Sequence, residues 1–239
     1  RETWNNSTKL LTVEVYKAFT NFLGIPFKAP RYQQQVKIPF IPLEQEIDAL
    51  IAGCSRKIAT ILQLLKETGM RIGEARSLEW TDIDLERGII TLNSPEKNSK
   101  PRMFKISARL VGMLNALPKN GKGPFKGNMV NLYRDFEVQR RSIANKLQNP
   151  RIEKITFHTL RHWKATMEYA KTKDILYVMH MLGHKNIKNT LIYTQLVSFE
   201  SDEYHFATAI TIEEAGKLIQ AGFEYVCHHN DVMLFRKRK

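Results

Sequence analysis

The sequence is short of the residues that would build a disulfide scaffold, a cysteine–zinc site or a membrane span. Its 239 residues include two cysteines, Cys54 and Cys227, and no CxxC pair, which favours a reduced, cytoplasmic protein. It has no run of about 18 apolar residues and no signal-peptide pattern, so we predict no membrane association. Because it begins with Arg1 rather than Met, we expect it to be a fragment of a longer chain.

Positive charge is in excess. The formal net charge is +13 and the pI is about 9.7, which predicts an anionic partner, most simply nucleic acid. Residues 201–239 hold six acids and five bases, a net −1, so residues 1–200 carry +14. We therefore expect any nucleic-acid surface to lie before residue 200. Hydrophobic residues make up 43%, enough to bury a core.

Hydrophobic periodicity and breaker residues divide the chain into four parts. Apolar residues at helical spacing over 8–23 predict a helix, and we interpret 1–24 as the end of a truncated upstream domain. Four prolines in 25–42 predict an extended linker. Residues 43–200 form the main domain. Residues 201–239 predict a strand, a helix with a capping box at Thr211 and Glu214, and a hairpin turning near Asn230.

The main domain is predicted to be mainly α-helical. The segment 87–107 alternates and breaks in the middle, which indicates two short strands around a basic turn. The remaining periodic segments predict helices over 43–54, 55–69, 71–80, 107–117, 129–147, 158–172, 174–183 and 186–196. The fold class is thus a helical domain with a small β-hairpin sheet, plus a C-terminal strand–helix–hairpin appendage.

The stretch "ITFHTLRHWKAT" raises the question of a metal site. His158 and His162 are four apart, a spacing that suits a metal, whereas His158 and Arg161 are three apart, a spacing that suits a phosphate. Zinc sites need three or four protein ligands, and the sequence has no HExxH and no third histidine at a completing spacing. We therefore predict no metal site, and His162 is assigned a supporting role.

Several residues with useful chemistry stand at predicted helix starts or in the hairpin turn. Each alone is ordinarily a solvated or a core residue, so only the set carries weight. Two arginines can clamp one phosphate. A lysine and two histidines can move protons or neutralise charge, and a tyrosine can be a covalent nucleophile. The members are Arg71, Lys97, His158, Arg161, His184 and Tyr193.

The order of "TGMRIGEARSL", a basic hairpin, "HTLRH" and "LGHKNIKNTLIYTQL" resembles the tyrosine recombinase, or phage-integrase, family. The resemblance covers roughly residues 40–197. "PFIPLEQEIDALI" is similar to the usual entry into the family's catalytic domain, which would be residues 43–200, with 1–24 the end of a core-binding domain. The appendage is similar to that of integrases from archaeal plasmids and viruses.

The resemblance implies a role for each member of the set. Tyr193 would attack the scissile phosphate and form a 3′-phosphotyrosyl link. Arg71 and Arg161 would hold the non-bridging oxygens, and Lys97, chosen over Lys100, would protonate the departing 5′ oxygen. His158 would be the base toward Tyr193. The remaining implied roles are a phosphate hydrogen bond from His184 and orientation of Arg71 by Glu74.

The resemblance further implies cleavage and rejoining of double-stranded DNA attachment sites without metal, ATP or other cofactor. It implies a tetramer on DNA from a protein that is monomeric in solution, with the appendage docking on a neighbouring protomer. Three alternatives stay open: a type IB topoisomerase, a non-enzymatic helix-turn-helix DNA binder and a metal-dependent nuclease. The basic residues expected to contact DNA, rather than form a merely solvated face, are Lys100, Arg102, Lys105, Arg134, Arg140, Arg141, Lys164 and Lys185.

Overall fold

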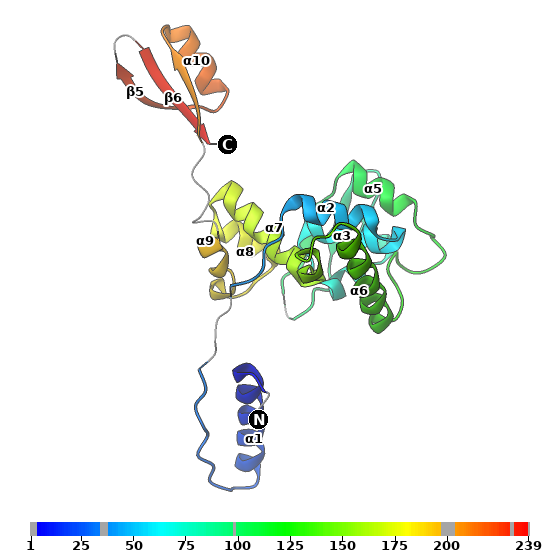
Figure 1. The fold of residues 1–239 in the computed structure, drawn as a ribbon. Coiled ribbons are helices and arrows are strands. Elements are labelled where there is room, and N and C mark those ends of the chain that lie inside the picture. The colour runs from blue at the N-terminus through cyan, green and yellow to red at the C-terminus, as the bar shows by residue number, and fades with distance from the viewer. Residues whose placement is uncertain (1–3, 34–37, 98, 197–203, 230–231, 239) are drawn as a thin grey trace. The chain divides into compact units, whose positions relative to one another are not determined.

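A computed structural model describes residues 4–33, 38–97, 99–196, 204–229 and 232–238 (Figure 1). The chain divides into two compact units, residues 1–40 and 41–239. Among the described residues, no helix is long and apolar enough to cross a membrane.

The first unit consists of helix α1, Asn6–Phe22, and an extended segment after it. The side chain of Asn5 caps α1 by accepting a hydrogen bond from the Thr8 amide. The apolar residues that predicted this helix, such as Val15 and Phe22, are exposed. The ring of Phe27 packs against Tyr16, with the ring centroids 5.4 Å apart.

Helix α3, Arg56–Thr68, is the centre of the second unit because most of its residues are buried. It packs against α2 (Glu44–Gly53), α5 (Ala108–Asn115) and α7 (Phe157–Thr172), and Figure 1 shows these helices gathered with α6. The other helices of the main domain are α4 (Ile72–Ser77), α6 (Met129–Lys146), α8 (Ile175–Leu182) and α9 (Ile192–Leu196), with the short 3-10 helices η1 (Trp80–Asp82), η2 (Ile152–Lys154) and η3 (Ile187–Asn189).

Two predicted elements differ from the structure. The single helix expected over 186–196 is instead η3 followed by α9. The predicted hairpin is a three-stranded antiparallel sheet in the order β1-β2-β3, formed by Ile83–Asp84, Ile89–Leu92 and Arg102–Lys105. Strand β1 has two residues, too few to show an alternating pattern in the sequence. The remaining predicted helices and both hairpin strands are present, although the helix predicted over 71–80 ends at Ser77, so the predicted fold class is confirmed.

The C-terminal segment folds as predicted, with β4 (Tyr204–Ala209), α10 (Ile212–Gln220), β5 (Glu224–His229) and β6 (Val232–Arg238). The sheet order is β4-β6-β5, and its small core contains Ala209, Ala215 and Phe235. Thr211 and Glu214 form the predicted capping box. The turn predicted near Asn230 lies outside the described residues.

Candidate active site

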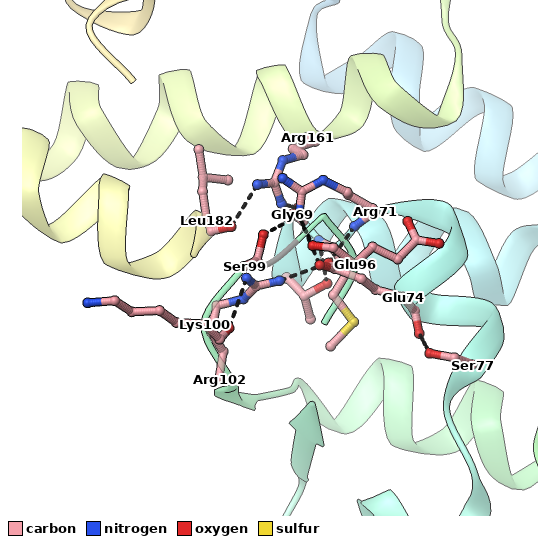
Figure 2. A network of polar contacts seen from close by, with 12 residues as sticks. Gly69, Arg71, Glu74, Ser77, Glu96, Ser99, Lys100, Arg102, Arg161 and Leu182 are labelled. Carbon is pink, nitrogen blue, oxygen red and sulfur yellow. Dashed lines mark hydrogen bonds and ion pairs between the residues drawn. The ribbon is translucent and has the colours of Figure 1, made fainter. Parts of the chain in front are cut away.

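Arg161 is fixed between the ends of two helices. Thr156 caps α7 by accepting a hydrogen bond from the Thr159 amide, and the next turn carries Arg161 into the interior, where it is 2% exposed. Its Nη1 donates to the carbonyl of Gly69 at the end of α3, and its Nη2 donates to the carbonyl of Leu182 at the end of α8, both at 2.7 Å (Figure 2). Helix C-termini are negative ends of dipoles, so they offset the desolvation of the guanidinium.

The contact of Arg161 with His184 fixes the tautomer of the imidazole. Nη2 of Arg161 lies 3.1 Å from Nε2 of His184, and Nδ1 of His184 lies 2.9 Å from the Thr190 hydroxyl oxygen. Arginine can only donate, so Nε2 accepts and Nδ1 carries the proton toward Thr190. Burial, reinforced by the charges of Arg161 and Arg71, lowers the pKa of His184 to about 4. His184 is therefore a neutral imidazole near pH 7.

Arg71 belongs to a buried ion-pair network that Figure 2 shows at close range. Glu74, one helical turn after Arg71 on α4, is fully buried and accepts from Nη1 of Arg71 at 3.0 Å. Its other carboxylate oxygen accepts from the Arg71 amide at 2.9 Å and from Nη2 of Arg102 at 2.8 Å. Although burial acts to raise the pKa of Glu74, these hydrogen bonds and the charges of both arginines together lower it. The carboxylate is therefore ionised and bridges two cations.

The β2–β3 loop contacts the side chain of Arg71. Nη1 of Arg71 donates to the Ser99 hydroxyl oxygen at 2.7 Å, with a longer contact of 3.5 Å to the Glu96 carbonyl. Lys97 lies between these two residues and is exposed, with φ of 54°, a left-handed backbone conformation. Lys97 also lies close enough to His158 for its charge to lower the pKa of that imidazole, after burial and the charge of Arg161.

Tyr193 on α9 is 2% exposed and packs against Ala165, Val178 and Leu182. Its hydroxyl oxygen lies 3.0 Å from Nδ1 of His162. Burial raises the pKa of Tyr193, opposed by the charges of Arg161 and Arg71. Burial, with His158 and Arg161, lowers the pKa of His162 to about 4. Both partners of this hydrogen bond are thus neutral near pH 7.

The histidine beside the tyrosine is not the one that we expected. The resemblance implied that His158 is the base toward Tyr193, whereas the hydrogen bond with the Tyr193 hydroxyl is made by His162. The His158 ring stands edge-on against His162, with centroids 4.6 Å apart. The spacing of four residues therefore brings the imidazole rings of His158 and His162 into contact with each other. Within the described residues, no group of three or more histidine, cysteine or acidic side chains is placed to hold a metal.

The residues expected to contact DNA differ widely in exposure. Arg102 was expected on the basic face of the hairpin but is 6% exposed and paired with Glu74, because it alternates with the exposed Met103 and Lys105 along β3. Two more are tied to protein groups: Arg140 donates to the Ile155 carbonyl at 2.7 Å, and Lys164 pairs with Glu168. The exposed members are Lys100, Lys105, Arg134, Arg141, which pairs with Glu137, and Lys185.

Ser99 and Thr190 belong to the site but were not predicted from the sequence. Ser99 bonds Arg71, and Thr190 fixes the His184 tautomer. Hydroxyl residues are common in loops, and neither stands at a spacing that marks it out, so no sequence signal identifies them. Among the members of the predicted set, Arg161 contacts His184, and the charges of Arg161 and Arg71 act on Tyr193, so residues of four separate elements lie near one another.

The protein is a member of the phage integrase family, whose family model matches residues 43–198. Tyrosine recombinase XerA of Saccharolobus solfataricus is 27% identical over 197 residues, which cover 79% of this chain and 65% of that protein. A tyrosine recombinase of Agathobacter rectalis is 35% identical over 156 residues, which cover 60% of this chain and 49% of that protein. The chain therefore spans between about half and two-thirds of the length of these relatives.

Solved structures show the same fold. A crystal structure of XerA recombinase matches 91% of this chain and 77% of that chain with a TM-score of 0.55 at 22% identity. The catalytic domain of bacteriophage HP1 integrase matches 67% of this chain and 89% of that domain with a TM-score of 0.52 at 26% identity.

Proposed function

We propose that the protein is a site-specific DNA recombinase that cuts and rejoins DNA through a 3′-phosphotyrosyl intermediate, using neither metal nor ATP. The observation that carries the proposal is the convergence of two guanidinium groups and a histidine-bonded tyrosine hydroxyl at one place. Membership of the phage integrase family supports it.

The arginines supply electrostatic stabilisation. In the pentacoordinate transition state, negative charge accumulates on the non-bridging oxygens of the phosphate, where guanidinium donors stabilise it. Arg161 is held rigidly by two carbonyls and His184, so it loses little freedom when the phosphate binds. Arg71 is held by Glu74, and its bond with Ser99 is the one that a phosphate oxygen would replace.

The covalent step exchanges one phosphate ester for another. The Tyr193 oxygen attacks phosphorus, the bond to the 5′ oxygen breaks, and Lys97 gives its proton to that oxygen. The Tyr193 proton passes to His162, the imidazole that contacts the hydroxyl, with His158 behind it. A pKa of about 4 makes His162 a weak base in the free protein, but a bound phosphate anion raises the pKa of nearby imidazoles. Rejoining reverses each transfer, so the ester energy is conserved.

The proposed substrates are two double-stranded DNA attachment sites, joined by a tetramer that assembles from monomers in the cytoplasm, at the nucleoid. Solved relatives support a DNA partner, since one is XerH recombinase bound to difH substrate and another is a λ integrase dimer bound to a core site. We assign residues 43–200 to the catalytic domain, 1–24 to the end of a core-binding domain and 25–42 to the linker. We propose that 201–239 dock on a neighbouring protomer.

Replacement of the nucleophile tests the proposal. On a nicked suicide DNA, the wild-type protein should form a covalent adduct that survives denaturing electrophoresis, and Tyr193→Phe should form none while keeping its DNA affinity and fold. Normal adduct formation by Tyr193→Phe would refute the proposal. Relaxation of supercoils without an attachment sequence would instead indicate a type IB topoisomerase, and chelator-sensitive cutting a metal nuclease.

A further inference from the structure

We propose that Arg102, a residue that touches neither DNA nor the reacting atoms, is a positioning residue that aims Arg71 through the shared carboxylate of Glu74. The inference rests on the proposed function. The basic hairpin sequence suggests a DNA contact for this residue, but the contacts of the side chain point inward.

Arg71 and Arg102 share the carboxylate of Glu74. Glu74 is fully buried and uses both oxygens, one for Nη1 of Arg71 at 3.0 Å and the other for Nη2 of Arg102 at 2.8 Å. A buried carboxylate is strongly oriented by its partners. If Arg102 is removed, Glu74 can turn toward its one remaining cation, and the guanidinium of Arg71 shifts with it.

Arg102 also contacts two segments of the chain other than α4. Its Nη1 donates to the carbonyl of Lys100 at 3.3 Å, on the loop that carries Lys97. The same nitrogen lies against Gly183, the left-handed residue with φ of 70° that ends α8, so that a Cβ at Gly183 would collide with it. His184 follows directly. One guanidinium thus contacts α4, the loop after β2 and the turn before His184 (Figure 2 shows the first two).

Arg102 also acts on Arg161 and His184 through its charge. The charge of Arg102 contributes to the lowered pKa of both Arg161 and His184, so it lies within the field of the phosphate site. Its side chain is nevertheless 6% exposed, and its Cζ atom lies over the Phe104 ring, 5.8 Å from the ring centroid. A cation in this place strengthens the positive potential of the site while its hydrogen bonds go to the protein.

The test separates positioning from binding by measuring two quantities. One is the single-turnover rate of adduct formation at saturating suicide DNA, and the other is the Kd for the same DNA with its salt dependence. Arg102→Gln should slow adduct formation by about 10- to 100-fold, because a displacement of about 1 Å costs on the order of 10²-fold. Its salt slope should stay at the wild-type value, because the side chain contacts no phosphate, and its Kd should change far less than the rate. Arg102→Lys keeps the charge but not the two-nitrogen geometry of the guanidinium. Its rate of adduct formation should therefore lie between those of the wild type and Arg102→Gln.

A double-mutant cycle with Glu74→Gln tests the route. If Arg102 acts through Glu74, the double variant should be as slow as Glu74→Gln alone, whereas independent effects multiply. The double variant loses one cation together with one anion, so it keeps the net charge of the network. If Arg102→Gln does not fold, the double variant is compared with Glu74→Gln instead. Met103→Gln, an exposed neighbour on β3, is the matched control and should match wild type in both quantities.

Three results would overturn the inference while leaving the proposed function intact. They are a higher Kd with a smaller salt slope and an unchanged rate for Arg102→Gln, an unchanged rate and Kd, or multiplicative effects in the cycle. Absence of an adduct with the wild-type protein would instead refute the proposed function itself.

Discussion

The two arginines and the lysine of the site are held in opposite ways. Arg161, Glu74 and Arg102 are buried and Arg71 is half-buried, and all four are bonded to helix ends or to one another. Lys97 is exposed on the β2–β3 loop in a left-handed conformation, and this loop contacts Arg71 through Ser99 and Glu96. The groups that we propose stabilise charge are therefore built into the fold, whereas the proposed proton donor lies on a loop.

This contrast means that substitutions in the two regions should separate activity from stability. A change in the loop should affect the rate and leave folding intact. A change in the buried network should affect folding as well.

Lys97→Ala should slow adduct formation by about 10²- to 10⁴-fold, the usual contribution of a general acid, and change the free energy of unfolding by less than about 0.5 kcal/mol. A substrate with sulfur in place of the 5′ bridging oxygen should restore the rate, because a thiolate departs without a proton. Lys100→Ala, on the same loop, is the control and should lose affinity rather than rate. If Lys100→Ala is the variant rescued by sulfur, Lys100 is the acid.

Glu74→Ala should lower the free energy of unfolding by about 3–5 kcal/mol, because it leaves buried guanidinium groups without their anion. Urea denaturation followed by circular dichroism measures this. Glu137→Ala is the control, since Glu137 also pairs with an arginine, Arg141, but at the surface, where such a pair contributes about 0–1 kcal/mol. Equal effects of the two variants would contradict the buried network.

The pH dependence of stability should reflect the neutral histidines. The folded-state pKa values of His162 and His184 are about 4, below the ordinary value of 6.5. The unfolded chain therefore binds more protons between these values, and the free energy of unfolding falls as the pH drops from about 6.5 to about 4. Urea midpoints should decrease over this window, and the decrease should be smaller in His184→Gln. An identical decrease in that variant would assign the effect to other groups.

Exposed basic residues should show the smallest effects. Lys185→Gln and Arg134→Gln should each weaken DNA binding a few-fold and reduce the magnitude of the slope of log K against log salt by about 0.9, the value for one phosphate contact. Fluorescence anisotropy over a salt series measures both. An unchanged slope for either variant would remove that residue from the DNA surface.

The sequence predicted most helices because their apolar residues recur at helical spacing, as in α3, where the buried face is continuous. The order of its motifs related residues far apart in the chain, and two of these, Arg161 and His184, are in contact in the structure. It did not predict β1, whose two residues carry no pattern. Nor did it predict that Arg102 turns inward, since pairing with Glu74 across 28 positions depends on the register of β3.

The contact of Tyr193 with His162 was also out of reach of the sequence. It depends on how α9 lies against α7, and adjacent histidine spacings cannot choose between His158 and His162. The sequence alone therefore pointed to candidate residues such as Tyr193, whereas the structure was needed to find the pairs that they form and the partners Ser99 and Thr190.

The burial of the Tyr193 ring has an evolutionary consequence. The ring fills the cluster of Ala165, Val178 and Leu182, and loss of a buried aromatic ring costs about 3–5 kcal/mol of stability. Under the proposed function, natural variation at this position is therefore limited twice, by the need for the hydroxyl and by the need for the ring. A lineage that abandons strand cleavage is still constrained to keep an aromatic residue here. Phenylalanine is then the expected relic of a lost activity, and small or polar residues should be rare.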